Sequence, residues 1–213
     1  MPPTKKTKLS QEEQAEEENF QKLADIQNQV AKLDEELENE IALLQSRYDA
    51  LKKPFYESRK PFISGIKNFW ADVISIHPLF SKMLNDTELE ILKYLTDIEV
   101  ENDISKDTKF FKVTFKFKEN PFFTNTELWK LIRSKPQEEA PETQQSEIKW
   151  KEGQNVFASE NDKKRKHQQD QSLFKVFVEE TEYDEDFISI IVDEIYANPL
   201  SILIGEDEEE TDV

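Results

Sequence analysis

The chain has 213 residues, with 28 lysines and arginines against 46 aspartates and glutamates, and its formal net charge at pH 7 is −18. Such a charge repels nucleic acid and anionic membranes and attracts basic partners, and no apolar run approaches the ~20 residues that span a bilayer. The chain has no cysteine, which excludes disulfides, thiol catalysis and cysteine-ligated zinc, and its three glycines are too scattered for a phosphate-cradling loop.

Residues 1–10 contain two prolines and three lysines and show no periodicity. We expect this N-terminal segment to be disordered, and it lacks the apolar core of a signal peptide. Ser10 then predicts the start of a helix as its N-cap, because a serine side chain can accept a hydrogen bond from a free backbone N–H of the first turn.

An apolar stripe with helical spacing runs from Phe20 to Phe55, in steps of three or four residues and with nothing polar on it. A helix from Gln11 to Lys53 would be about 65 Å long, which no small domain can bury along its whole length. We therefore predict a dimerisation helix over residues 11–60, paired with a second copy or another long helix. Consecutive steps of four around Leu37 form a stutter that locally unwinds a supercoil. The predicted dimerisation residues are Leu23, Ile26, Val30, Leu33, Leu37, Ile41, Leu44, Tyr48 and Leu51.

Two prolines are predicted to interrupt this helix, because proline lacks a backbone N–H and clashes with the preceding turn. We expect Pro54 to end or kink it and Pro61 to make a second break. An amphipathic pattern predicts a short helix within Ile66–Ile76, and another is expected over Glu88–Leu95 with Asp86 or Thr87 as its cap.

The apolar period then changes to two, which is typical of strands. A strand around Ile98 and Val100 should pair with a strand over Lys109–Lys118, so that the acidic outer face of the first meets the basic outer face of the second. Further strands are expected over Glu127–Arg133 and Ser146–Lys151.

The C-terminal part predicts a buried short helix at Leu173–Val178 and a last helix over Asp184–Ala197, followed by an apolar run at Leu200–Ile204 that packs on or covers something. The fold class is therefore α+β. The long dimerisation helix is followed, over residues 61–204, by a domain with an antiparallel sheet of about four strands and covering helices. Residues 205–213 form an acidic tail.

Candidates for catalysis are few. His77 precedes a proline at a helix end and is read as structural, and His167 lies in a charged loop. The sequence lacks metal-ligand spacing, so we expect no enzyme, no cofactor and no metal. One basic run can be a nuclear-import signal, a nucleic-acid patch or a solvated loop, and its polar flanks suit import best. This run is Lys163, Lys164, Arg165 and Lys166.

An ordered set of segments resembles the nucleosome assembly protein family of histone chaperones, and within it the SET (template-activating factor) branch. The resemblance covers about Phe20 to Ile204. Its segments are Tyr48–Trp70, His77-Pro78, Tyr94–Thr96, Glu119–Phe123, Ser146–Lys151 and Ile195–Leu200.

The resemblance implies a headphone-shaped homodimer in the nucleus, in which α+β "earmuff" domains bind core histones on their inner and lower surfaces. Asp193 and Glu194 correspond by position to acids on the concave side of family members, and further acids neighbour them in sequence. Each of these acids can equally be a solvated residue favoured by a helix dipole. The neighbouring acids are Glu179, Glu180, Glu182, Asp184 and Glu185.

Two hypotheses follow for function. In the first, the protein is a histone chaperone that binds basic core histones through acidic surfaces and promotes nucleosome assembly or disassembly without ATP. In the second, a dimeric acidic scaffold regulates a chromatin-modifying or phosphatase enzyme. Nucleic acid is expected to be bound only weakly or indirectly, and a membrane not at all. The acidic tail is much shorter than in SET-type proteins, and Pro61 lies where the family usually continues the helix.

Overall fold

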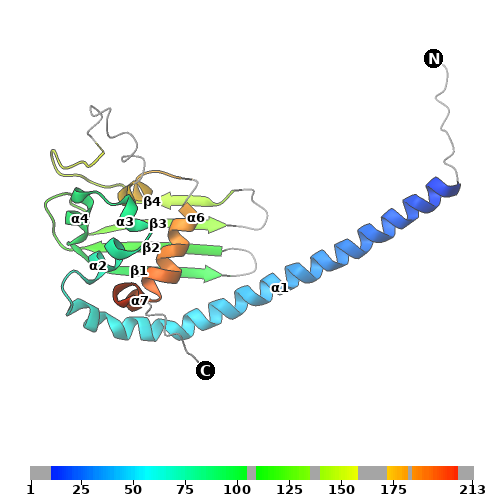
Figure 1. The fold of residues 1–213 in the computed structure, drawn as a ribbon, viewed down its shortest axis with the longest axis horizontal. Coiled ribbons are helices and arrows are strands. Elements are labelled where there is room, and N and C mark those ends of the chain that lie inside the picture. The colour runs from blue at the N-terminus through cyan, green and yellow to red at the C-terminus, as the bar shows by residue number, and fades with distance from the viewer. Residues whose placement is uncertain (1–10, 105–108, 135–139, 158–171, 182–183, 206–213) are drawn as a thin grey trace, which may run out of the picture.

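The computed structural model describes residues 11–104, 109–134, 140–157, 172–181 and 184–205. One helix, α1 (Gln11–Ser64), projects as a rod from a head formed by the remaining elements (Figure 1). The head contains a four-stranded sheet with helices against one face. The α+β architecture and the long N-terminal helix are thus confirmed.

The rod neither ends at Pro54 nor breaks at Pro61, because both prolines lie inside α1. The alternative prediction of a kink agrees with the bend that α1 makes beside the head in Figure 1. Each proline deprives one preceding carbonyl of its helical hydrogen bond. Those carbonyls belong to Ala50 and Glu57, and both residues are exposed, so water can satisfy them. Packing of Ile63 into the core of the head also holds the last turns of the helix in place.

Three short helices follow the rod: α2 (Phe69–Ile76), α3 (Phe80–Met83) and α4 (Asp86–Leu92). The predicted helix within 66–76 is confirmed at α2. The helix predicted over 88–95 is misplaced, because α4 begins at Asp86 and Leu95 already belongs to a strand. The cap of α4 is Asn85, whose side chain accepts a hydrogen bond from the backbone of Glu88, while the Glu88 carboxylate accepts one from the backbone of Asn85.

The sheet consists of β1 (Leu95–Ile104), β2 (Lys109–Phe117), β3 (Glu127–Ser134) and β4 (Glu142–Gln145), antiparallel and in sequence order. The predicted hairpin of β1 and β2 is confirmed, with its acidic and basic outer faces paired. Lys112 Nζ lies 3.0 Å from Glu101 Oε1, and Lys116 Nζ lies 2.7 Å from Glu99 Oε2.

The fourth strand is not where we predicted it. Residues 142–145 form β4, although they are polar, whereas the predicted strand at 146–151 is irregular apart from an isolated bridge between Trp150 and Phe123. Trp150 and Ile148 alternate with polar residues because they cover the end of the core. That alternation imitates a strand without requiring a ladder.

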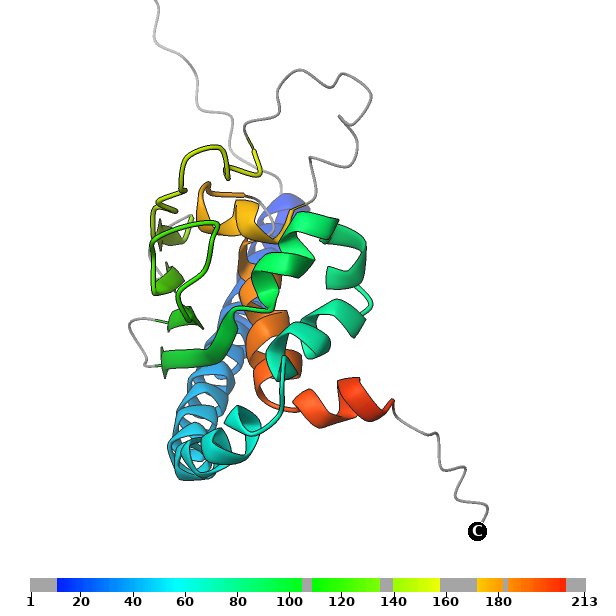
Figure 2. The same ribbon diagram turned by 90° about the vertical axis from the view of Figure 1, so that its left-hand side faces the viewer.

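The C-terminal part covers the sheet. A 3₁₀-helix, η1 (Leu173–Phe177), and a continuous helical segment made of α6 (Asp184–Ile190) and the π-helix η2 (Ile191–Tyr196) precede the short α7 (Pro199–Ile204). Figure 2 shows the same helices from the side. Phe177 contacts Phe115 of the sheet and Phe187 of α6, with ring centroids 5.1 Å and 6.0 Å apart. The predicted buried helix at 173–178 and the last helix are confirmed in their main extent.

A buried ion pair joins the sheet to α6. Lys130 of β3 is 0% exposed, and its ammonium group lies 2.5 Å from a carboxylate oxygen of Asp184. The same nitrogen donates to the carbonyls of Val176 and Glu179 at 2.8 Å and 3.0 Å, and the Asp184 carboxylate also accepts from the hydroxyl of Thr181. Burial lowers the pKa of Lys130, and the pairing with Asp184 opposes this shift. All three ammonium protons therefore have acceptors.

Replacing Lys130 by methionine leaves a buried carboxylate without its cation. We expect the free energy of unfolding, measured by urea denaturation at fixed protein concentration, to fall by about 3–5 kcal/mol. As a control, Lys112→Met removes an exposed surface pair and should cost less than about 1 kcal/mol. The double variant Lys130→Met/Asp184→Asn should lose at least about 1 kcal/mol less than the two single variants together. Additive losses would contradict a coupled pair.

Candidate functional site

The acids that the resemblance implies fall into three groups. Glu179, Glu180, Glu185, Asp193 and Glu194 are exposed on the head. Glu182 lies outside the described residues, as do the predicted import residues Lys163, Lys164, Arg165 and Lys166.

Asp184 does not belong to this surface, although we predicted that it does. It is 3% exposed and is bound to Lys130, so its charge is neutralised inside the head. The sequence offered a weak signal for this. Lys130 stands at an inward position of β3, between Leu128 and Ile132, where a lysine requires a buried partner.

One side of the α6–η2 segment presents acids to an open cleft. Glu185, Ser189 and Asp193 are spaced four residues apart and line the cleft together, and the Ser189 hydroxyl donates to Asp193 at 2.9 Å. The π-helical turn keeps Ile191 and Ile195 buried while both acids of η2 remain exposed. This arrangement gives the cleft one negatively charged wall.

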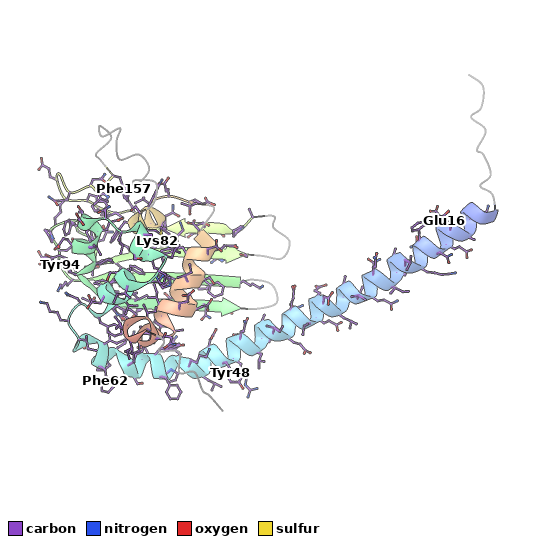
Figure 3. All side chains as sticks on the ribbon, viewed as in Figure 1. Glu16, Tyr48, Phe62, Lys82, Tyr94 and Phe157 are labelled. Atoms are coloured by element: carbon purple, nitrogen blue, oxygen red, sulfur yellow. The ribbon has the colours of Figure 1, made fainter. Side chains whose placement is uncertain are left out.

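The cleft lies where α1 leaves the head, close to the labelled Tyr48 in Figure 3, and has a volume of about 910 Å³. Its opposite wall is α1, with Tyr48, Asp49 and Lys53, and its floor includes Val100 of β1 and Phe111 of β2. Asn102 of β1 links the floor to the α1 wall by donating to the Asp49 carboxylate at 2.7 Å. The cleft therefore combines an apolar floor with charged walls.

A buried histidine contacts the carboxylate of Glu194. His77 is 5% exposed, and its Nε2 lies 3.0 Å from the Glu194 carboxylate, whose side chain is 56% exposed. We predicted only a structural histidine, and the structure shows that it has an acidic partner. Residues that are 117 positions apart cannot be matched from one sequence, and the one available hint was the place of His77 at the end of α2.

Rod and head are joined by a cation held between aromatic rings. The Arg59 guanidinium lies 4.5 Å from the ring centroids of both Tyr56 and Tyr196, and it donates to the Tyr196 carbonyl. Next to it, Lys60 contacts Glu99 of β1 at 3.0 Å. Burial opposes the charge of Lys60, but hydrogen bonds to acidic neighbours outweigh it and raise its pKa. Sequence reasoning missed this joint, because these residues lie between the two prolines expected to break the helix.

The predicted dimerisation stripe stays on the surface of a single chain. All nine of its residues are exposed, by between 47% and 63%. Their spacing is symmetric about Leu37. Leu33 and Ile41 lie four residues from it, Val30 and Leu44 seven, Ile26 and Tyr48 eleven, and Leu23 and Leu51 fourteen. A stripe with this symmetry matches itself when a second copy runs antiparallel.

Other site chemistry is not found in the described part of the chain. There, no cluster of three or more histidine, aspartate or glutamate residues could hold a metal ion. The helices described are also too short or too polar to cross a membrane.

Comparison with known proteins gives a consistent result. The model of the family described as "Nucleosome assembly protein (NAP)" matches residues 62–194. The chain is 29% identical to NAP1-related protein 2 of Arabidopsis thaliana over 203 residues, which cover 90% of this chain and 78% of that protein. It is 30% identical to Protein SET of Drosophila melanogaster over 207 residues, which cover 91% and 76%.

A solved structure is similar in both sequence and fold. The crystal structure of Nucleosome assembly protein S from Plasmodium falciparum matches with a TM-score of 0.67 and 29% identity, and the match covers 86% of this chain and 99% of that one. The crystal structure of the malaria parasite Nucleosome Assembly Protein matches with a TM-score of 0.69 at 24% identity, which supports the fold.

Proposed function

Because this chain belongs to the nucleosome assembly protein family, we propose that it is a histone chaperone that binds core histones through acidic surfaces of a homodimer. Proteins of this family bind histones, dimerise and are not enzymes. The chaperone would shield basic histones and promote nucleosome assembly or disassembly without ATP. Its surface charge favours such partners over nucleic acid.

The proposed binding surface rests on one observation, the row of exposed acids along α6–η2. Glu185 and Asp193 line the cleft together, and the exposed Glu194 follows Asp193 in the chain and contacts His77. Neither cleft acid has a basic partner among the ion pairs of the described residues, so both are free to pair with lysines and arginines of a ligand. Glu179 and Glu180, exposed at the start of this region, extend the surface.

The exposed stripe of α1 supports the homodimer. Burying the remaining exposed part of one large apolar side chain contributes about 1 kcal/mol. Two copies provide nine such positions each. The total exceeds the roughly 4–15 kcal/mol that association costs, so an antiparallel pair centred on Leu37 can be stable.

We also propose the nucleus as the location, because core histones act there and the basic run at 163–166 suits an import signal. Changing these four residues to alanine in a fluorescent fusion should shift the protein toward the cytoplasm. An unchanged distribution would show that the run is not the signal.

Antiparallel pairing about Leu37 can be tested with single cysteines, because the native chain has none. In the Leu37→Cys variant each cysteine meets its own copy, so mild oxidation should give a disulfide-linked dimer on a non-reducing gel. Leu23→Cys is the matched control. Its two copies should lie about 42 Å apart, at 1.5 Å per residue, and stay unlinked. Linkage at both positions would indicate parallel helices, and linkage at neither would contradict the dimer.

Reversing the charges in the cleft should weaken histone binding. We expect the variant Glu185→Lys/Asp193→Lys to raise the Kd for histone dimers or tetramers about tenfold at physiological salt, with a smaller salt dependence. The control, Glu147→Lys/Glu152→Lys, makes the same charge change at exposed positions in the loop after β4.

Two results would overturn this assignment. Equal losses in both variants would mean that net charge, and not the cleft, governs binding. Full histone binding in the cleft variant, combined with loss of a chromatin-modifying or phosphatase partner, would favour the regulatory scaffold.

A further inference from the structure

The sheet of the head has one open edge in the described part of the chain. Its first strand, β1, packs against α1, where Lys60 contacts Glu99 at 3.0 Å and Asn102 donates to Asp49. The last strand, β4, lies on the opposite side of the sheet (Figure 1). It pairs with β3 on one side, and no described strand pairs with its other side. The backbone of β4 is therefore available to a further strand.

The hydrogen bonds to β3 show which backbone groups of β4 face the open edge. Ser146 donates its N–H to the carbonyl of Trp129 at 2.9 Å, so these two residues form a hydrogen-bonded pair of the ladder. Such pairs alternate along an antiparallel strand, and the next one contains Gln144. The N–H and C=O groups of Thr143 and Gln145 therefore point away from β3. Within the described ranges, no hydrogen bond is formed by these four groups.

A pocket of about 450 Å³ lies beside this edge. Thr143 lines it together with Ile132, its neighbour across the ladder, and Ile132 belongs to the core, so the pocket is on the inner face of the sheet. Glu180 and Glu185 also line it, and both are exposed. Neither acid has a basic partner among the ion pairs of the described residues. The pocket thus combines apolar surface with two uncompensated carboxylates.

A strand added to β4 would direct alternate side chains into this pocket. In an antiparallel pair, side chains that stand opposite each other lie on the same face of the sheet. The residue opposite Thr143 therefore points to the inner face, where Glu180 and Glu185 can bind a lysine or an arginine. The residues before and after it point to the outer face.

Charge decides which strand this edge accepts. An exposed edge strand can pair with other copies of the same chain. Here each copy has a net charge of −18, and Glu142 is exposed on the strand itself, so two such edges repel each other. A basic segment is instead attracted to the edge.

We propose that β4 binds an extended basic tail of a histone as a fifth strand of the sheet, with a lysine or arginine in the pocket between Glu180 and Glu185. This inference rests on the proposed function, which supplies the histone. Thr143 and Gln145 offer four backbone hydrogen bonds that any sequence can use, while the pocket selects a cation. Glu185 also lines the cleft, so the fifth strand continues the surface on which the rest of the histone is bound.

Hydrogen exchange resolved to single residues tests the pairing directly. Core histones are added with their tails intact or after removal of the tails by limited trypsin digestion. Intact histones should slow exchange at Thr143 and Gln145, whereas Gln144 and Ser146, whose N–H groups face β3, should change little. Trimmed histones should leave all four unchanged. Slow exchange at Thr143 and Gln145 already in the protein alone would overturn the inference, because the chain would then cover this edge itself.

A proline at position 145 removes one of the edge donors. Gln145→Pro should leave the ladder to β3 intact, because proline is tolerated where the N–H of an edge strand faces outward. Loss of one backbone hydrogen bond should raise the Kd for intact histones about two- to tenfold, and the Kd for trimmed histones should not change. Gln145→Val is the matched control, because it changes the side chain but keeps the N–H. An unchanged midpoint of urea unfolding shows that the proline variant is folded.

Glu180→Gln tests the pocket without a change in the strand. It should weaken the binding of intact histones more than Glu147→Gln does, which removes the same charge from an exposed position in the loop after β4. Equal effects of these two variants would overturn the inference, as would a proline variant that binds intact histones as the valine control does. Each of these results can occur in a protein that still binds histones. The proposed function would fail differently, by loss of binding to intact and trimmed histones alike.

Discussion

The placement of Arg59 between two tyrosine rings is the interaction on which the arrangement of this molecule depends. The rings belong to opposite parts, Tyr56 to the rod and Tyr196 to the end of the covering helix, and the guanidinium also satisfies a carbonyl of the π-helical turn. A planar cation between two aromatic faces fixes the relative orientation of the two rings as well as the distance between them. Together with the contacts of Lys60 to β1, it sets the angle at which the head sits on the rod. The cleft exists because α1 diverges from the sheet at this angle.

The acids of the head are divided between two different tasks. Asp184 is taken into the interior, where Lys130 and the backbone N–H and hydroxyl of Thr181 compensate for its lost hydration, and it anchors α6 to the sheet. Asp193 and Glu194, two turns and more further along, remain in water, where their charge is available to a partner. A rigid support under exposed charge reduces the conformational entropy that a binding surface loses when a ligand is bound. In the same way, the contact with His77 restrains the exposed side chain of Glu194.

Periodicity predicted the elements whose faces differ strongly in polarity. The stripe of α1 and the hairpin of β1 and β2 have such faces, whereas the helix at 173–177 was predicted from its continuous apolar run. Prediction failed where tertiary contacts override local preference. Packing of Ile63 carries the helix past Pro61, and the polar β4 forms because β3 offers it a free edge. The exposed acids of the candidate surface were predicted from the family pattern. The two buried contacts, His77 with Glu194 and Lys130 with the buried Asp184, join distant segments, and one sequence cannot show that these residues meet.

The uninterrupted helix between Leu37 and Arg59 has a further consequence in the proposed antiparallel dimer. Each residue in this interval adds about 1.5 Å to the separation of a head from the centre, and it also turns that head by about 100° around the rod axis. Inserting a single residue would hardly change the span, but it would point one acidic face away from the other. The length of the rod therefore determines how the two heads are rotated relative to each other around the rod axis. Changes of length should be tolerated in evolution where they restore a whole number of turns, as seven residues do.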